Sequence, residues 1–196
     1  MGFFYTGKGD SGKSAVGKKK IAKTRPVMEA LGDLDELNSL IGLVRSRTGS
    51  DKTRKILREA QESLFIIQAS IAIAEFGGSP RSNKSGRGSS AGGKYPAPEL
   101  EKSKVKELEK TIDAIEKKIK PERGFIISGE SESSAWLDYA RAVTRRAERS
   151  VLKYHKTKKL NANILAYINR LSSLFFALAR SEAKKSGKKE QHPKYK

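Results

Sequence analysis

The residues of this chain that are best suited to chemistry begin close to its N-terminus, in a glycine-rich segment. Residues 7–14 read GKGDSGKS and satisfy the P-loop pattern G-x-x-x-x-G-K-[ST]. Glycines let the backbone approach an anion closely, and consecutive N–H groups can form a nest around one. Lys13, Ser14 and Lys23 add donors suited to phosphate oxygens. The segment therefore indicates either a phosphate-binding loop or, equally, a mobile glycine-rich tail.

The surroundings of this segment argue against a P-loop nucleotide triphosphatase. A P-loop joins a buried parallel strand to an amphipathic helix. Here the apolar run before the segment is only residues 3–5, which is short for a buried strand. Residues 16–20, which follow the segment, show no helical pattern. Apart from 3–5 and 125–127, no stretch of the sequence predicts a strand, so a parallel sheet is not expected. A P-loop-like phosphohydrolase, which would release single phosphate or diphosphate, stays an alternative.

A second set of polar residues lies on a predicted helix in the last third of the chain. Arg141, Arg145 and Glu148 stand at i, i+4 and i+7 and therefore share one helical face. An apolar stripe lies nearly opposite them and consists of Val143, Ala147 and Val151. Core packing cannot select the arginine face, which must meet solvent, a ligand or another subunit. A solvated face with an internal ion pair is the plain alternative.

Further polar residues stand on two other predicted helices. The acidic residues near residue 33 could simply complement a helix dipole, but that explanation is weaker for Asp35 and Asn38. Asn169 and Arg170 interrupt an otherwise apolar stretch. An amide in such a place either completes a buried hydrogen bond or reads a base edge.

Five amphipathic helices are predicted to position these residues, because apolar residues recur at intervals of three and four. The helices cover 27–47, 51–75, about 100–120, about 131–154 and about 161–183. Mostly short connections between them predict an all-α, up-and-down five-helix bundle. We therefore expect a glycine-rich N-terminal loop at 1–26, a bundle domain at 27–183 and a basic tail at 184–196.

Composition narrows the class of protein. The 196 residues contain no cysteine, which excludes disulfides and thiolate catalysis and favours a reducing cytoplasm. We expect neither a signal peptide nor a membrane span. Residues 79–97 are rich in Gly, Ser, Lys and Arg and predict a disordered loop. The formal charge of +19 points to polyanions and keeps a nucleic-acid-binding bundle as an alternative, although few aromatic residues stand among the basic runs.

Taken together, these segments resemble the PduO-type ATP:cob(I)alamin adenosyltransferases over nearly the whole chain outside the basic loop and tail. Three ordered motifs carry the resemblance. Residues 5–14, YTGKGDSGKS, are similar to the family's T-x-x-G-D-x-G-x-[ST] loop. The others are GDLDELNS at 32–39, and RAVTRRAER at 141–149 together with YINRLS at 167–172.

The resemblance implies a role for individual residues. By this resemblance, the triphosphate of ATP would be bound by Thr6, Gly7, Lys8, Gly9, Ser14 and Lys23. The resemblance completes the ATP site with Arg145, Arg146, Glu148, Arg149 and Asn169. It places the corrinoid, the cobalt-containing substrate, against Asp35, Phe125, Arg141 and Phe176, with the first three of these taking part in catalysis. Asp35 would pair with Arg141 of a neighbouring subunit in a homotrimer.

The implied reaction transfers the 5′-deoxyadenosyl group of ATP to the cobalt of cob(I)alamin, with Mg²⁺ on the leaving triphosphate. No protein nucleophile and no metal site made of side chains is needed, because the protein has mainly to align the reacting atoms and stabilise a polyanion. Phe125 would displace the lower axial ligand of cobalt and exclude water. A cobalt reductase and an adenosylcobalamin-dependent acceptor enzyme are the expected partners.

Overall fold

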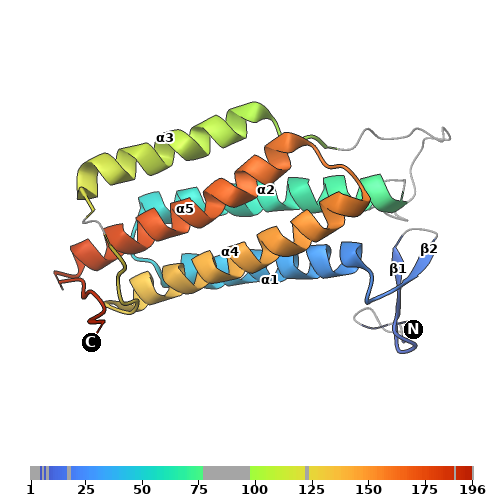
Figure 1. Ribbon diagram of the computed structural model, residues 1–196, viewed down its shortest axis with the longest axis horizontal. Helices are drawn as coiled ribbons and strands as arrows, with labels where there is room; N and C mark the ends of the chain where they lie inside the picture. The colour runs from blue at the N-terminus through green and yellow to red at the C-terminus, as the bar shows by residue number, and fades with distance from the viewer. Residues whose placement is uncertain are drawn as a thin grey trace.

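The chain folds into a bundle of helices with a small β-hairpin at one end (Figure 1). A computed structural model describes residues 5, 7, 9–16, 19–76, 98–121, 124–187 and 189–195. Within this part of the chain the helices are α1 (Pro26–Arg47), α2 (Asp51–Phe76), α3 (Lys102–Ile119), α4 (Glu132–Thr157) and α5 (Ala162–Lys185). The hairpin consists of β1 (Lys13–Val16) and β2 (Lys19–Ala22).

All five predicted helices are confirmed, and the local sequence explains where they begin and end. Pro26 occupies the first turn of α1, where its missing N–H is not needed. Ser131 and Ser134 form a capping box at the start of α4. Asn161 accepts a hydrogen bond from the Asn163 N–H at the start of α5. These caps satisfy donors that the first helical turn leaves free.

The predicted strand at 125–127 is wrong, because this segment is irregular, and the two observed strands were not predicted. β1 and β2 pair antiparallel, with Lys13 opposite Ala22 and Val16 opposite Lys19. Five lysines between residues 13 and 23 hide the alternation of apolar residues that signals a strand. The predictions for Thr6, Lys8, residues 3–4 and the loop at 79–97 fall outside the described residues.

The core forms where α5 packs between α3 and α4 while α1 packs on α2 and α4 (Figure 1). Contrary to the expectation from the sequence, one described helix, α5, is long and apolar enough to cross a membrane by length and composition, with a mean hydropathy of 1.3. However, 56% of its most apolar window is buried inside the bundle. Because α5 packs against α3, α4 and α2, most of its surface faces other helices and can be apolar, which explains its high hydropathy.

Packing along α5 leads to a stability prediction. Leu174 is fully buried on α5, whereas Leu152 on α4 is 41% exposed. Leu174→Ala should lower the free energy of unfolding by about 2–5 kcal/mol, since it leaves a cavity in the core. Leu152→Ala should cost less than about 1 kcal/mol. Urea unfolding followed by circular dichroism measures both, and equal losses would contradict the assigned core.

Candidate active site

The glycine-rich segment folds into two successive turns that present backbone to a neighbouring lysine. The Asp10 N–H donates to the Gly7 carbonyl at 3.3 Å, and the Gly12 N–H donates to the Gly9 carbonyl at 3.2 Å. Gly7 and Gly12 adopt φ angles of 65° and 73°, the left-handed region that favours glycine. A Cβ built on Gly9 would stand 3.2 Å from the Lys23 Nζ. Bare backbone and an ammonium group thus meet at one place, as an anion site requires.

The hairpin brings Lys23 back to this loop. The Lys23 N–H donates to the Gly12 carbonyl at 2.9 Å, so the end of β2 is tied to the turn before β1. Lys13 is exposed and Ser14 is half-buried at the start of β1. In a P-loop, a helix would begin at these two residues and direct its N-terminus at the phosphates. Here a strand begins instead and α1 starts only at Pro26, so the structure does not support the P-loop alternative.

A three-residue contact fixes the hairpin to the bundle. Arg25 follows β2, and its guanidinium lies 3.2 Å from the carboxylate of Glu75 on α2. The Tyr154 hydroxyl on α4 donates to the same carboxylate at 3.1 Å. Burial is the main reason that the pKa of Tyr154 is raised, with the Glu75 charge adding to it, so the hydroxyl keeps its proton. The C-terminal end of the hairpin, just before α1, is therefore held against the C-terminal ends of α2 and α4.

The structure brings Glu148 and Asn169 together on the outer face of α4 and α5. The Asn169 Nδ2 donates to Glu148 Oε1 at 2.9 Å, and Arg170 donates to Asn169 Oδ1 at 2.7 Å. Arg145 is exposed one turn before Glu148, and Arg149 donates to the Arg145 carbonyl at 3.1 Å. The stripe of Val143, Ala147 and Val151 is buried, as the sequence predicted. Both the nitrogen and the oxygen of the Asn169 amide have hydrogen-bond partners, so these contacts fix the orientation of the amide.

Arg146 is separated from these residues and faces α1. Its guanidinium donates to Glu36 and lies 3.9 Å from Asp33, whose carboxylate also accepts a hydrogen bond from Ser150. The hydrogen bond with Glu36 raises the pKa of Arg146. Asp33 therefore does more than complement a helix dipole, because it joins α1 to α4. Arg146 takes part in the same helix contact.

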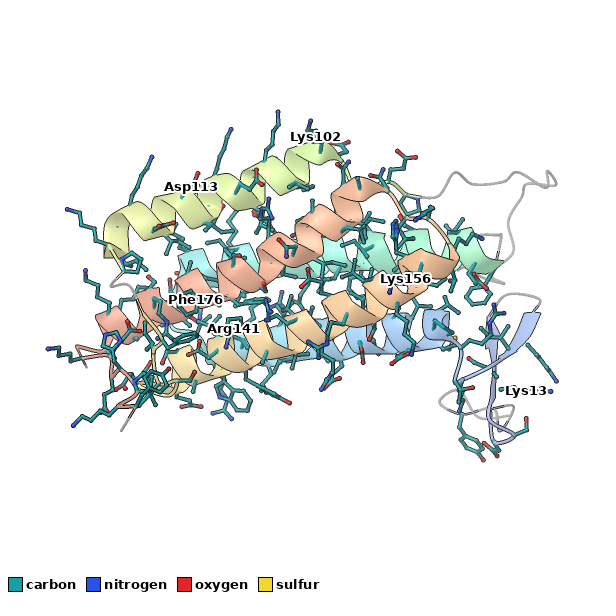
Figure 2. All side chains as sticks on the ribbon, in the orientation of Figure 1. Lys13, Lys102, Asp113, Arg141, Lys156 and Phe176 are labelled. Carbon is teal, nitrogen blue, oxygen red and sulfur yellow. The ribbon has the colours of Figure 1, made fainter. Side chains whose placement is uncertain are left out.

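A cavity of about 390 Å³ lies between α3, α4 and α5. Its cationic side consists of Arg141, Arg145 and Arg180, and its apolar side includes Phe176, which is 39% exposed. Figure 2 shows Arg141 and Phe176 on neighbouring helices in the same part of the bundle. Phe125, in the segment before α4, is 78% exposed. The Phe176 ring beside these arginines suits a large ligand that is apolar on one face and negatively charged elsewhere.

Two buried charged residues beside this cavity were missed from the sequence. Arg180 is 3% exposed and pairs with Asp138, which is 5% exposed. Asp138 Oδ1 in turn lies 4.0 Å from the Arg141 Nε. The signal for Arg180 was an arginine inside the apolar run of α5, and the signal for Asp138 was its position one turn before Arg141. Asp35 is exposed on α1, and no ion pair joins it to Arg141 within the described residues of one chain.

The glycine-rich loop and the cavity lie towards opposite ends of one chain. Lys153 on α4 pairs with Glu29 at the start of α1 at 2.7 Å, so the hairpin end of the bundle lies beside residue 153. Arg141 stands twelve residues earlier on α4, about 18 Å along the helix axis at the usual rise per residue. Figure 2 shows Lys13 at the hairpin end, with Arg141 and Phe176 well along the bundle from it.

The family model described as cobalamin adenosyltransferase matches residues 4–182. The chain belongs to this family. Corrinoid adenosyltransferase MMAB from Bos taurus is 34% identical over 190 residues, covering 95% of this chain and 74% of that protein. The corrinoid adenosyltransferase of Bacillus subtilis is 32% identical and covers 93% of this chain and 88% of that protein. Corrinoid adenosyltransferase PduO from Citrobacter freundii is 32% identical over 91% of this chain, which spans only 49% of that protein's length.

Solved structures give the same result. A variant PduO-type ATP:corrinoid adenosyltransferase from Lactobacillus reuteri, complexed with cobalamin and ATP, superposes with a TM-score of 0.81 at 27% identity. It covers 97% of this chain and 98% of that one. The resemblance found in the sequence is therefore confirmed. The nucleic-acid-binding and phosphohydrolase alternatives receive no support from these relatives.

The anchoring of the hairpin can be tested with two tyrosines of α4. Tyr154→Phe removes the hydroxyl that Glu75 accepts and should cost about 1 kcal/mol of stability. It should also speed amide hydrogen exchange in residues 19–25. Tyr139→Phe is the matched control, because Tyr139 is 50% exposed on the same helix. If exchange in residues 19–25 does not change in Tyr154→Phe, the contact does not anchor the hairpin.

Proposed function

We propose that this chain is an ATP:cob(I)alamin adenosyltransferase, which forms adenosylcobalamin and triphosphate. The observation that supports this most is the cationic and apolar cavity between α3, α4 and α5, in a chain that belongs to the cobalamin adenosyltransferase family. Variants of the related PduO-type enzyme from Lactobacillus reuteri have been solved in complex with cobalamin and ATP, and in complex with ATP. The exposed ring of Phe125 and the half-exposed ring of Phe176 offer apolar surface for the corrin.

In this proposal the glycine-rich loop holds the triphosphate of ATP. Gly9 and Lys23 form the anion site described above, while Ser14 and the N-terminal part of the loop, with Thr6, Gly7 and Lys8, add donors. The rest of ATP contacts the outer face of α4 and α5, where Arg145, Glu148, Arg149 and Asn169 lie. Arg146, which the family resemblance also gives to ATP, faces α1 and contacts Glu36 in this structure. Mg²⁺ would arrive on the phosphate oxygens, since this ion usually combines few protein carboxylates with substrate phosphates.

The chemistry is a displacement at carbon. The electron pair of cobalt(I) forms the bond to the 5′ carbon of ATP, and the bond from that carbon to the phosphate oxygen breaks. The triphosphate leaves with that bonding pair, so no protein group has to take or give a proton. The negative charge on the leaving group grows in the transition state, where Lys23 of one copy, Arg145 of a neighbouring copy and backbone N–H groups would stabilise it. Alignment of the cobalt with the 5′ carbon is the other contribution of the protein.

Phe125 supplies an apolar surface on the corrinoid side. A ring against the lower face of the corrin displaces the lower axial ligand and excludes water. Loss of that donor lowers the electron density along the cobalt axis, which makes reduction of cobalt(II) easier. Asp35 and Arg141 would hold α1 of one copy beside this surface.

The proposed assembly is a homotrimer with each active site between two copies. Within one chain, the loop proposed to bind the triphosphate lies far along the bundle from Phe176 and Arg141. Among the described residues of one chain, no positively charged side chain pairs with Asp35. A second copy can supply the missing half. We further propose that the protein works in the cytoplasm, with a cobalt reductase and an adenosylcobalamin-dependent enzyme as partners.

Product analysis tests the proposed reaction. Purified protein with ATP, Mg²⁺ and chemically reduced cobalamin should give a light-sensitive cobalt–carbon product and triphosphate in equal amounts. Boiled protein is the control for the uncatalysed reaction. Release of orthophosphate or diphosphate without the cobalt–carbon product would contradict the proposal and favour a phosphohydrolase.

The shared site can be tested by mixing two inactive proteins. Asp35→Ala and Arg141→Ala should each lower activity strongly, because a planar guanidinium would lose its carboxylate partner. In an equimolar mixture with random exchange, about a quarter of the interfaces would carry both native residues, and activity should recover to about that fraction. No recovery after exchange has been verified by native mass spectrometry would contradict a pair between copies.

A further inference from the structure

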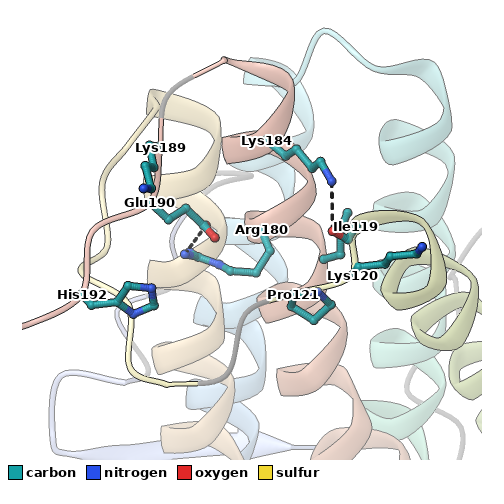
Figure 3. A pocket seen from close by; sticks show the side chains of 8 residues that line it. All are labelled: Ile119, Lys120, Pro121, Arg180, Lys184, Lys189, Glu190 and His192. Carbon is teal, nitrogen blue, oxygen red and sulfur yellow. Dashed lines mark hydrogen bonds and ion pairs between the residues drawn. The ribbon is translucent and has the colours of Figure 1, made fainter.

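A line of four alternating charges, of which the middle two are buried, connects the C-terminal segment of the chain to Arg141. The Arg180 side chain on α5 is 3% exposed and donates both to Asp138 on α4 and to Glu190, the latter at 2.5 Å. Figure 3 shows the contact of Glu190 with Arg180. Asp138 then lies 4.0 Å from Arg141. The order of charges is Glu190, Arg180, Asp138 and Arg141, alternating in sign.

The segment that carries Glu190 also holds the backbone around Phe125. The Ile127 N–H donates to the Gln191 carbonyl at 2.8 Å. The Nδ1 of His192 lies 2.8 Å from the Phe125 carbonyl oxygen, which can only accept, so this nitrogen donates. Gln191 and His192 therefore bind this backbone at two points, the Ile127 N–H and the Phe125 carbonyl, both just after the Cα that carries the Phe125 side chain. Among the described residues, 124–130 belong to no helix or strand, so these two contacts help to fix the segment.

Arg180 stands where these contacts converge. Its guanidinium carbon lies 5.1 Å from the centre of the Phe176 ring. It lines the 390 Å³ cavity with Arg141 and Phe176, and also an adjoining cavity of about 290 Å³ that contains Glu190 and His192. A buried arginine needs its carboxylates, because an uncompensated buried charge is costly. Docking of Glu190 is thus coupled to the position of Asp138.

We propose that Arg180 is a positioning residue, which uses Glu190 to dock residues 190–192 on the Phe125 segment and uses Asp138 to orient Arg141. This inference rests on the proposed adenosyltransferase function and gives the C-terminal segment a part in it. Arg180 does not touch ATP in this account. It acts on the corrinoid half of the site through Phe125, Phe176 and Arg141.

Glu190→Gln is the sharpest test, because it keeps the buried Arg180–Asp138 pair and so keeps the fold. The Ile127 amide in the free protein should exchange about tenfold faster, since local opening controls exchange. The kcat/KM for cobalamin should fall about tenfold while the KM for ATP stays within about twofold. Glu132→Gln is the control, because Glu132 pairs with Arg47 at 3.3 Å on the exposed surface of α4 and should change neither quantity.

Two further variants separate positioning from general stability. Arg180→Lys keeps the charge but cannot bridge two carboxylates as a fork, so its loss should equal or exceed that of Glu190→Gln. In a Phe125→Ala background, Glu190→Gln should lower kcat/KM for cobalamin by less than about threefold, because the residue it positions is gone.

The outcomes are distinct. Unchanged exchange at Ile127, equal effects on ATP and cobalamin, or a full tenfold loss in the Phe125→Ala background would each overturn the inference. Failure of the wild-type chain to form adenosylcobalamin would instead overturn the proposed function, and the positioning role in that reaction with it. The exchange measurement uses free protein, so it decides the contact between residues 190–192 and the Phe125 segment in either case.

Discussion

The length of the helices is the constraint on which the rest of the structure depends. Since α1 and α4 run side by side, as the Lys153–Glu29 contact shows, the hairpin end of the bundle and the cavity near Arg141 are separated by several turns of helix. The two halves of the proposed active site therefore lie in different parts of one chain. A glycine-rich turn with Lys23 suits phosphate oxygens, while Phe125, Phe176 and the buried charges suit a large, flat ligand. An enzyme that joins ATP to a corrinoid must bring both together, and a second copy of the chain is the simplest means.

Ion pairs and hydrogen bonds hold each half of the proposed site in place. At the hairpin end, Arg25, Glu75 and Tyr154 form one contact between three elements, and burial keeps the tyrosine protonated as a donor. At the other end, the buried Arg180 pairs with the buried Asp138 and with the partly exposed Glu190. Isolated buried charges are costly, so such groups persist where they are paired and where the geometry they impose is useful. Both contacts join segments far apart in sequence and position irregular backbone, which helical packing alone leaves unfixed.

The sequence predicted the helices well because their apolar residues repeat along α1 to α5 over many turns. It also grouped Glu148 with Asn169 through the family motifs, and the structure brings the two into contact. The hairpin was missed because lysines conceal its short alternation of apolar residues. The segment at 125–127 was misread as a strand because three consecutive apolar residues occur in strands as well as in irregular segments. Arg180 and Asp138 were missed because the local signals, an arginine in an apolar run and an aspartate one turn before Arg141, do not show that the two side chains meet between helices. The docking of Glu190 depends on the same long-range contact.

A structure of the protein with ATP and cobalamin bound would show whether two copies of the chain share each active site. We expect the triphosphate to lie at Gly9 and Lys23 of one copy, while the corrin contacts Phe125 and Phe176 of a neighbouring copy. Asp35 and Arg141 should then meet across the same boundary. A nucleotide and a corrin held entirely by residues of a single chain would contradict this expectation.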